Sequence, residues 1–148
     1  MEQLLAGVGL ALMVGLSGAG SAIGLVYGGS AVIGMIRKKP EAFGSGLVIS
    51  GLPATQGLYG FVAFILFSPE MKPDLNYFQA SVIFSAGLIV GLVSFVSAIQ
   101  QGRVCANGID AIGGGHDAFG KTMILAAFPE FYAILGLVTA ILMKGFLV

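Results

Sequence analysis

Residues 117–142 read DAFGKTMILAAFPEFYAILGLVTAIL, a largely apolar run that begins with Asp117 and has a second carboxylate, Glu130, near its middle. Residues 41–66 read EAFGSGLVISGLPATQGLYGFVAFIL. They align with that run without a gap when the sequence is shifted by 76 positions, so that residue 41 falls on residue 117. Both runs carry a proline at the same place, but Ala54 stands where the later run has Glu130. An internal repeat of this size indicates two copies of one supersecondary unit, and only the second copy has the carboxylate.

Four apolar stretches are each long enough to cross a hydrocarbon core, which takes about 20 helical residues. Of the 148 residues, 57% are hydrophobic and only 9% are charged, whereas a soluble domain carries about 25% charged residues. The composition and the repeat together predict an all-α membrane protein with four transmembrane helices in two tandem hairpins. The predicted spans are residues 4–36, 43–67, 77–99 and 123–148, and the predicted hairpins are residues 1–76 and 77–148, the second carrying Glu130.

Basic residues in the short connections predict the orientation. The connections at residues 37–41 and 103–121 hold five basic residues, against Lys72 and Lys144 elsewhere. Because Lys and Arg are enriched in cytoplasmic loops, we expect these two connections in the cytoplasm and both termini outside, in a multi-pass protein of the cell membrane.

Small residues recur at helical spacing on the first and third spans. Such faces let helix backbones approach closely. They fit packing inside one chain as well as the inner wall of an oligomer. The two stripes are Gly20, Gly24 and Gly28 on the first span, and Gly87, Gly91, Ser94 and Ala98 on the third.

Glu130 is the one charged residue well inside a predicted span. An ionised side chain at that depth costs about 2.5–3.5 kcal/mol on insertion scales, and intramembrane carboxylates are typically ion or proton sites. The alternative is a protonated, hydrogen-bonded core Glu without a transport role.

Polar partners for Glu130 are available on the second and third spans. Thr55 and Tyr59 are four residues apart and share a helix face, Gln56 lies beside them, and Gln101 is near the end of the third span. Pro53 can free a nearby carbonyl because it lacks an N–H. Oxygen atoms around a single negative charge suit a hard, monovalent cation. Ordinary helix–helix hydrogen bonding is the alternative interpretation.

Residues 115–122 read GHDAFGKT and match the phosphate-loop pattern GxxxxGK[ST]. That motif functions between a strand and a helix, and here it follows a membrane span, so the sequence predicts a turn leading into the fourth helix and no nucleotide. His116 is interpreted as a solvated loop residue. The formal net charge is zero, which gives no electrostatic basis for nucleic-acid binding.

These features resemble the proteolipid (K or c) subunit of V-type ATPases over the whole chain. Residues 52–60 (LPATQGLYG), 101–104 (QGRV) and 128–130 (FPE) are similar to its bacterial sodium-translocating branch in particular. The resemblance implies a non-catalytic subunit that carries Na⁺ while ATP is hydrolysed on other subunits. It implies that Na⁺ is bound by Glu130, Thr55, Gln56, Gln101 and the carbonyl of Leu52, and that Tyr59 hydrogen-bonds the carboxylate.

The resemblance also implies partners. They are a homo-oligomeric ring, a stator subunit with an essential Arg, a central-stalk subunit at the cytoplasmic loops, and membrane lipid. Two alternatives stay open at this point: H⁺ carried at Glu130 in the same ring, or a small ion-coupled multidrug-type exporter. The absence of Trp disfavours the aromatic substrate cavity of an exporter. A structural or pore-forming bundle would leave Glu130 unexplained.

Overall fold

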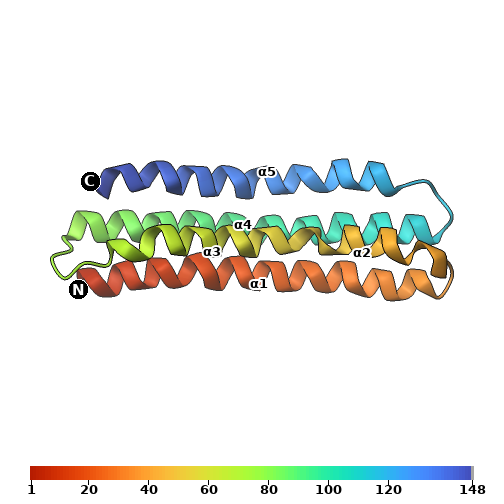
Figure 1. Cartoon of the computed structure of the whole chain (residues 1–148), viewed down its shortest axis with the longest axis horizontal. Helices are drawn as coiled ribbons and strands as arrows, with labels where there is room; N and C mark the ends of the chain where they lie inside the picture. Colours follow the sequence, from red (N-terminus) through yellow and green to blue (C-terminus); the bar gives the residue numbers. More distant parts are fainter. Residues whose placement is uncertain (148) are drawn as a thin grey trace.

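The computed structural model describes residues 1–147 as four antiparallel helical segments (Figure 1). All four are long and apolar enough to cross a membrane, and residues 1–147 contain no strand. The predicted all-α membrane fold is therefore confirmed. The elements are α1 (Glu2–Ile36), η1 (Pro40–Ala42), α2 (Phe43–Gly51), η2 (Leu52–Ala54), α3 (Thr55–Phe67), η3 (Ser68–Glu70), α4 (Tyr77–Gly113), α5 (Phe119–Lys144) and η4 (Gly145–Leu147).

The connections gather at the two ends of the bundle. Both chain ends and the connection after η3 lie at one end, while the α1–η1 and α4–α5 connections lie at the other (Figure 1). The α1–η1 connection, which holds Lys38 and Lys39, and the α4–α5 connection therefore share one end of the molecule, where Lys121 lies in the first turn of α5.

The third span is longer than the sequence predicted. The prediction ended it at residue 99 and treated residues 103–121 as a loop, but α4 continues to Gly113 and only residues 114–118 connect it to α5. This part of the prediction was wrong because Gly and charged residues in 103–113 suggested a connection. In the fold, Cys105, Ile109 and Ile112 are buried in one apolar cluster with Val32 and Met35 of α1, and this packing stabilises the extra helical turns.

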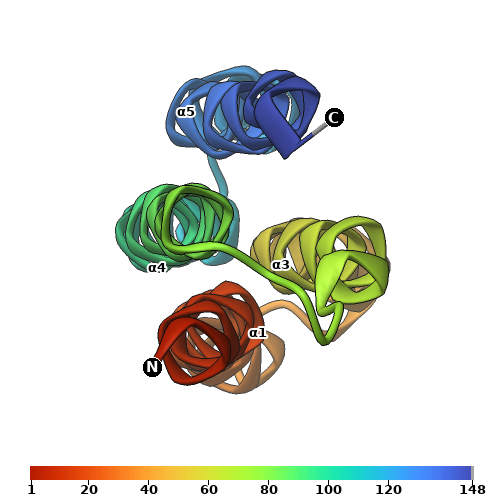
Figure 2. The ribbon, with the colours of Figure 1, turned by 90° about the vertical axis from the view of Figure 1, so that its left-hand side faces the viewer.

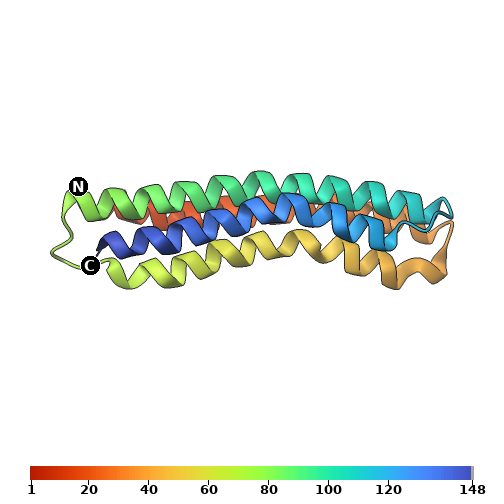
Figure 3. The same cartoon turned by 90° about the horizontal axis from the view of Figure 1, so that it is seen from above.

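The second span is helical from end to end but is not one continuous α-helix. A 3₁₀ turn, η2, separates α2 from α3 at Pro53, and Figure 3 shows the segment bending along its length. Pro53 lacks the N–H that an α-helix requires at this point. Pro129, its repeat equivalent, lies inside α5 without ending that helix.

Glycines bring α1 and α4 into the most extensive helix contact of the chain. A Cβ added at Gly87 would overlap the carbonyl oxygen of Gly9, and one added at Gly102 would lie 2.5 Å from the Cα of Gly24. Both glycine stripes thus contribute to packing inside the chain. Figure 2 shows α4 between α1 and α5, with α3 beside α1 and α4.

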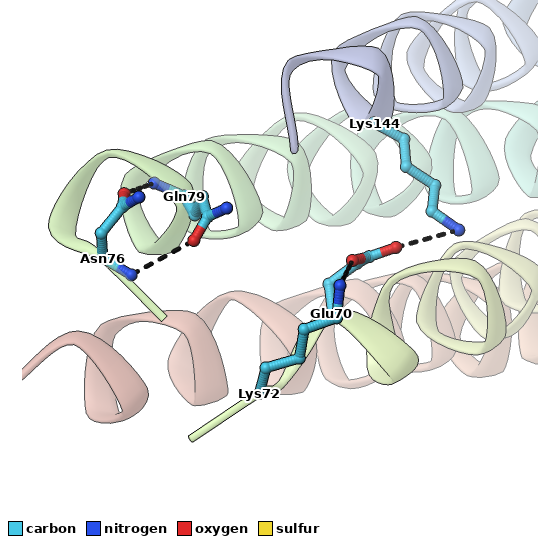
Figure 4. Close-up of polar contacts among 5 residues, drawn as sticks. All are labelled: Glu70, Lys72, Asn76, Gln79 and Lys144. Carbon is cyan, nitrogen blue, oxygen red and sulfur yellow. Dashed lines mark hydrogen bonds and ion pairs between the residues drawn. The ribbon is translucent and has the colours of Figure 1, made fainter. Parts of the chain in front are cut away.

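Polar contacts tie the elements together at the end that holds the termini (Figure 4). Asn76 caps α4 through a reciprocal hydrogen-bonded pair with Gln79. Glu70 of η3 forms ion pairs with Lys72 at 3.3 Å and with Lys144 of α5 at 3.4 Å. The last contact joins the ends of the two hairpins.

Candidate cation site

Glu130 lies in α5, half-buried, at a place where α3, α4 and α5 approach one another. Its carboxylate accepts two hydrogen bonds: Tyr59 Oη donates to Oε1 at 2.8 Å, and Gln101 Nε2 donates to Oε2 at 3.0 Å. Donors from α3 and α4 therefore hold both oxygens of a carboxylate that is carried on α5. Hydrogen bonds to an ionised group are the stronger kind.

Two fully buried amides form the inner part of the site. Gln56 and Gln101 are each 0% exposed, and Gln56 Nε2 donates to Gln101 Oε1 at 2.7 Å. Gln101 Nε2 also donates to the carbonyl of Ala126 in α5 at 2.9 Å. Buried polar groups are costly unless they are hydrogen-bonded, and these amides satisfy that requirement by bonding to each other and to α5.

Thr55 and Leu52 complete the group on the side of η2. Thr55 Oγ1 donates to the carbonyl of Leu52 at 3.1 Å and lies 3.3 Å from Gln56 Oε1. The 3₁₀ turn at Pro53 places these oxygens at the junction between η2 and α3, next to the buried amides. The six residues singled out from the sequence are thus linked in one hydrogen-bonded chain, which runs in the order Leu52, Thr55, Gln56, Gln101, Glu130 and Tyr59.

Ser97 belongs to this group and was missed in the sequence analysis. Its Oγ accepts from Gln56 Nε2 at 3.1 Å and donates to the carbonyl of Pro129 at 2.8 Å. Ser97 precedes Gln101 by four residues, so the two share a face of α4, and that spacing could have identified it. Ser21, its repeat equivalent, accepts instead from the backbone N–H of Gly57 at 2.7 Å.

The atoms of the site that could bind a cation are all oxygens, and only one of the groups that carry them is a carboxylate. Amide, hydroxyl and carbonyl oxygens are ligands for hard cations such as Na⁺, and one negative charge balances one monovalent cation. Residues 1–147 contain no group of three His, Cys, Asp or Glu side chains that could hold a metal ion. A proton on Glu130 would neutralise the site equally well, so the fold accommodates either ion.

The first hairpin has no matching site. In the repeat, Ala54 of the first hairpin corresponds to Glu130, and Leu25 corresponds to Gln101. Gln56 corresponds to Tyr132 of the second hairpin. The apolar and aromatic side chains at these positions offer no carboxylate or amide oxygen. The chain therefore has one such carboxylate for four membrane-spanning segments.

Residues 115–122 form the end of a connection and the first turn of α5. The helix α4 precedes them and no strand does so. Lys121 Nζ donates to the carbonyl of Asp117, and the Thr122 hydroxyl donates to that of Ala118. The lysine and hydroxyl that a phosphate loop directs at its ligand are here bonded to the local backbone.

Comparison with known proteins assigns both halves of the chain to the same family. The chain matches the family of the ATP synthase C subunit twice, over residues 8–67 and 84–143. These two matches are offset by 76 positions, the same shift that aligns the repeat. They cover well over half of the chain.

Named relatives include components of archaeal, bacterial and eukaryotic ATPases. The chain is 39% identical over 140 residues to the K subunit of an A-type ATP synthase from Methanocaldococcus jannaschii, covering 95% of this chain and 61% of that protein. It is 38% identical over 127 residues to the K subunit of a V-type sodium ATPase from Enterococcus hirae, covering 86% and 81%. It is 28% identical over 148 residues to the c'' subunit of a V-type proton ATPase from Saccharomyces cerevisiae, covering 95% and 70%. The chain thus spans less than two thirds of the archaeal relative.

Proposed function

Because this chain belongs to the ATP synthase C-subunit family, we propose that it is a non-catalytic rotor-ring subunit of a rotary V-type ATPase and that it carries Na⁺ across the cell membrane as the ring turns. The observation that carries the proposal is the Glu130 carboxylate within a membrane span, held at both oxygens by Tyr59 and Gln101. The likeness to a relative named as the K subunit of a V-type sodium ATPase favours Na⁺ over H⁺.

A cavity on the outer side of α4 and α5 supports assembly into a ring. Its volume is about 620 Å³, and its lining is almost entirely apolar. It is lined by Leu92, Val93, Val96, Ser97, Gln100, Phe128, Pro129 and Tyr132. The repeat equivalents of these residues line the groove of the first hairpin, which is filled by the chain's own second hairpin: Gly20 lies against Phe95, and Gly24 against Ala98. By the same geometry, the first hairpin of a second copy fits the cavity.

The complementary surface lies on α1. Gly87, Gly91, Ser94 and Ala98 of α4 are buried, and the two glycines pack directly against α1. Their repeat equivalents on α1, namely Ala11, Gly15, Gly18 and Ala22, are exposed in the single chain. A Cβ added at Gly15 or Gly18 would meet nothing within 4 Å. This small-residue face of α1 therefore fits α4 of a preceding copy.

The two surfaces differ from each other, so copies join head to tail. Head-to-tail interfaces produce rings when the rotation between copies closes. In such a ring the interface between copies repeats the interface between the two hairpins, residues 1–76 and 77–148. The hairpins are then the successive units of the ring wall.

The site suggests how an ion is carried. With Na⁺ bound, the Glu130 carboxylate is neutralised, and a neutral site can face lipid at far lower cost than a charged one. A stator arginine attracts the carboxylate and displaces the ion, and the emptied site refills from the other side. The loops at residues 37–41 and 114–118 face the cytoplasm and the central stalk. One carboxylate for four helices means few ions per turn, which favours pumping driven by ATP hydrolysis on other subunits.

Carbodiimide labelling of Glu130 tests the proposal. These reagents react with a protonated carboxyl, so purified rings should be labelled at Glu130 at mildly acidic pH. NaCl added at fixed pH should slow the labelling, because Na⁺ competes with the proton, whereas KCl at the same ionic strength should not.

Two results would argue against Na⁺ transport. Labelling that responds to pH alone would leave a proton carrier in the same ring. Labelling that responds to neither pH nor Na⁺ would mean that Glu130 is a structural residue.

Replacing Gln101 with Leu should weaken Na⁺ binding while leaving the ring assembled. The change removes an amide oxygen from the site and a donor to Glu130. The loss of one such polar partner predicts a dissociation constant for Na⁺ raised by about 10- to 100-fold. Na⁺-dependent protection from carbodiimide, titrated on purified rings, measures it.

The control for this substitution is Gln3→Leu, which makes the same chemical change at an exposed position in the first turn of α1. Its affinity for Na⁺ should equal that of the wild type. Equal affinities in the Gln101 and Gln3 variants would remove Gln101 from the ligand set.

Replacing Val96 with Trp should block ring assembly and leave the chain folded. Val96 is exposed in the single chain and lines the cavity that the next copy is proposed to fill. The larger side chain would occupy that space, since overpacking a well-fitted interface costs about 1–3 kcal/mol per site. Native mass spectrometry in mild detergent should detect single chains in place of rings.

Val62→Trp serves as the comparison. Val62 and its repeat equivalent, Val138, are both exposed, so this position lies outside the proposed interface and its variant should form rings. Rings of wild-type mass and stability from Val96→Trp would contradict the assignment of the cavity.

A further inference from the structure

The hydroxyl of Ser97 in α4 joins two other helices that carry parts of the cation site. Ser97 is only 5% exposed. Its Oγ accepts from Gln56 Nε2 of α3 at 3.1 Å, and its proton is donated to the carbonyl of Pro129 in α5 at 2.8 Å. The hydrogen bonds to the Glu130 carboxylate come from other side chains. Ser97 therefore acts on the site through its partners.

The orientation of both buried amides follows from the groups around them. Gln101 Nε2 lies 2.9 Å from the carbonyl of Ala126 and 3.0 Å from a carboxylate oxygen of Glu130. Neither a carbonyl nor an ionised carboxylate can donate a hydrogen bond, so Gln101 must present its nitrogen to them and its Oε1 to Gln56. Gln56 in turn must donate to that oxygen, at 2.7 Å. The oxygen of Gln56 lies instead 3.3 Å from Thr55 Oγ1.

The amide nitrogen of Gln56 has a second N–H, and Ser97 is its acceptor. Gln56 is 0% exposed, and a buried N–H without a partner carries the full cost of its desolvation. With Ser97 in place, all four N–H groups of the two amides are bonded to oxygens. The amide oxygen is then the part of Gln56 that is left to face an ion.

The orientation of Gln56 matters more for Na⁺ than for a proton. Na⁺ needs the amide oxygen of Gln56 turned toward it, whereas in an empty site the side chain can turn to other partners. Fixing a group in its bound orientation beforehand lowers the cost of binding. A proton binds to the Glu130 carboxylate itself, whose hydrogen bonds come from Tyr59 and Gln101.

We propose that Ser97 is a positioning residue that favours Na⁺ over H⁺, because it accepts the second N–H of Gln56 and so holds the amide oxygen of Gln56 toward the ion. This inference rests on the proposed function, in which Gln56 is a ligand of Na⁺. The Pro129 carbonyl takes the one proton of the Ser97 hydroxyl. The lone pairs of Ser97 Oγ are therefore left to accept from Gln56.

Purified Ser97→Ala rings test the proposal through two readouts of carbodiimide labelling at Glu130. Protection by NaCl at fixed pH gives the dissociation constant for Na⁺, and the pH dependence of labelling in Na⁺-free buffer reports proton binding. The dissociation constant for Na⁺ should rise about 5- to 30-fold, the range expected when one buried N–H loses its acceptor. The pH of half-maximal labelling without Na⁺ should equal that of the wild type. A merely structural residue would shift both readouts or neither.

A double variant shows whether Ser97 acts through Gln56. In Gln56→Leu rings the amide is absent, so the further change Ser97→Ala should leave the affinity for Na⁺ as it is in Gln56→Leu alone. Such non-additivity identifies two residues that act together. An additional loss of the same size in the Gln56→Leu background would contradict the proposal.

Ser94→Ala is the matched control. Ser94 also lies on α4 and is 0% exposed, but its hydroxyl has no hydrogen-bond partner among residues 1–147. Its rings should bind Na⁺ with wild-type affinity. An equal loss of affinity in the Ser94 and Ser97 variants would mean that removing any buried hydroxyl of α4 weakens the site, and it would overturn the specific role of Ser97.

The remaining outcomes separate this inference from the proposed function. If NaCl protects wild-type and Ser97→Ala rings at the same concentrations, Ser97 has no positioning role and the proposed function stands. If NaCl does not protect wild-type rings, the proposed function itself fails. If Ser97→Ala rings do not assemble, Ser97→Cys rings give the answer, because a thiol is a weak acceptor. Their affinity for Na⁺ should fall at an unchanged pH of half-maximal labelling, and wild-type affinity would contradict the proposal.

Discussion

Glu130→Gln is expected to abolish Na⁺ binding while leaving the ring assembled. Gln has the shape of Glu but only one oxygen, so the substitution keeps one of the two hydrogen bonds from Tyr59 and Gln101 and removes the charge. A full charge beside a monovalent cation contributes several kcal/mol even at an effective dielectric constant of about 20. The affinity for Na⁺ should therefore fall by at least about a hundredfold, as measured by binding of radioactive Na⁺ to purified rings. Transport by the reconstituted ATPase should be lost with it.

Glu70→Gln is the matched control, because Glu70 is also a paired carboxylate but lies at the end of the bundle. Its rings should bind Na⁺ with wild-type affinity. If Glu130→Gln rings also bind Na⁺ at wild-type affinity, the carboxylate is not the anionic ligand, and the proposed function would have to be abandoned.

Gly87→Leu is expected to prevent folding of the bundle. A Cβ at this position already overlaps the backbone oxygen of Gly9, and backbone cannot move aside as a flexible side chain can. To admit Leu, α1 and α4 must separate, which would disrupt the most extensive helix contact in the chain. The predicted loss exceeds about 3 kcal/mol. Thermal unfolding in detergent and the yield of folded chain measure it.

Gly34→Leu makes the same change on α1 where an added Cβ meets nothing within 4 Å. Its repeat equivalent, Asp110, is exposed, so the position is open in the ring as well, and the variant should unfold near the wild-type temperature. A Gly87→Leu chain that unfolds at the same temperature as Gly34→Leu would contradict the backbone contact between α1 and α4.

The helical spans could be predicted because membrane insertion depends on local composition. A lipid-exposed segment must satisfy its own backbone hydrogen bonds, so a long apolar run such as residues 4–36 becomes a helix in any context. The end of α4 could not be predicted in this way. Residues 103–113 carry Arg, Asp and two glycines, and they are helical because Cys105, Ile109 and Ile112 pack against α1, a contact that no local pattern contains.

The residues of the candidate site were more predictable from the sequence than the hydrogen bonds that join them. Glu130 was identifiable from the cost of a buried charge, and the polar residues of the second span from their spacing. Ser97 was not singled out, because a serine in a membrane helix most often bonds locally. Its link between Gln56 and the Pro129 carbonyl requires three elements to meet.

By itself, the sequence determined the all-α membrane fold, the repeat, and the presence of one carboxylate for four spans, because each follows from the residues along a single segment or from a comparison of two segments. Only the tertiary structure decided which atoms surround Glu130, that Gln56 and Gln101 bond to each other, and that Ser97 links Gln56 to the carbonyl of Pro129. These are contacts between helices far apart in the chain. They depend on how closely the glycines let α1 and α4 approach, and that distance is set by packing across the whole bundle.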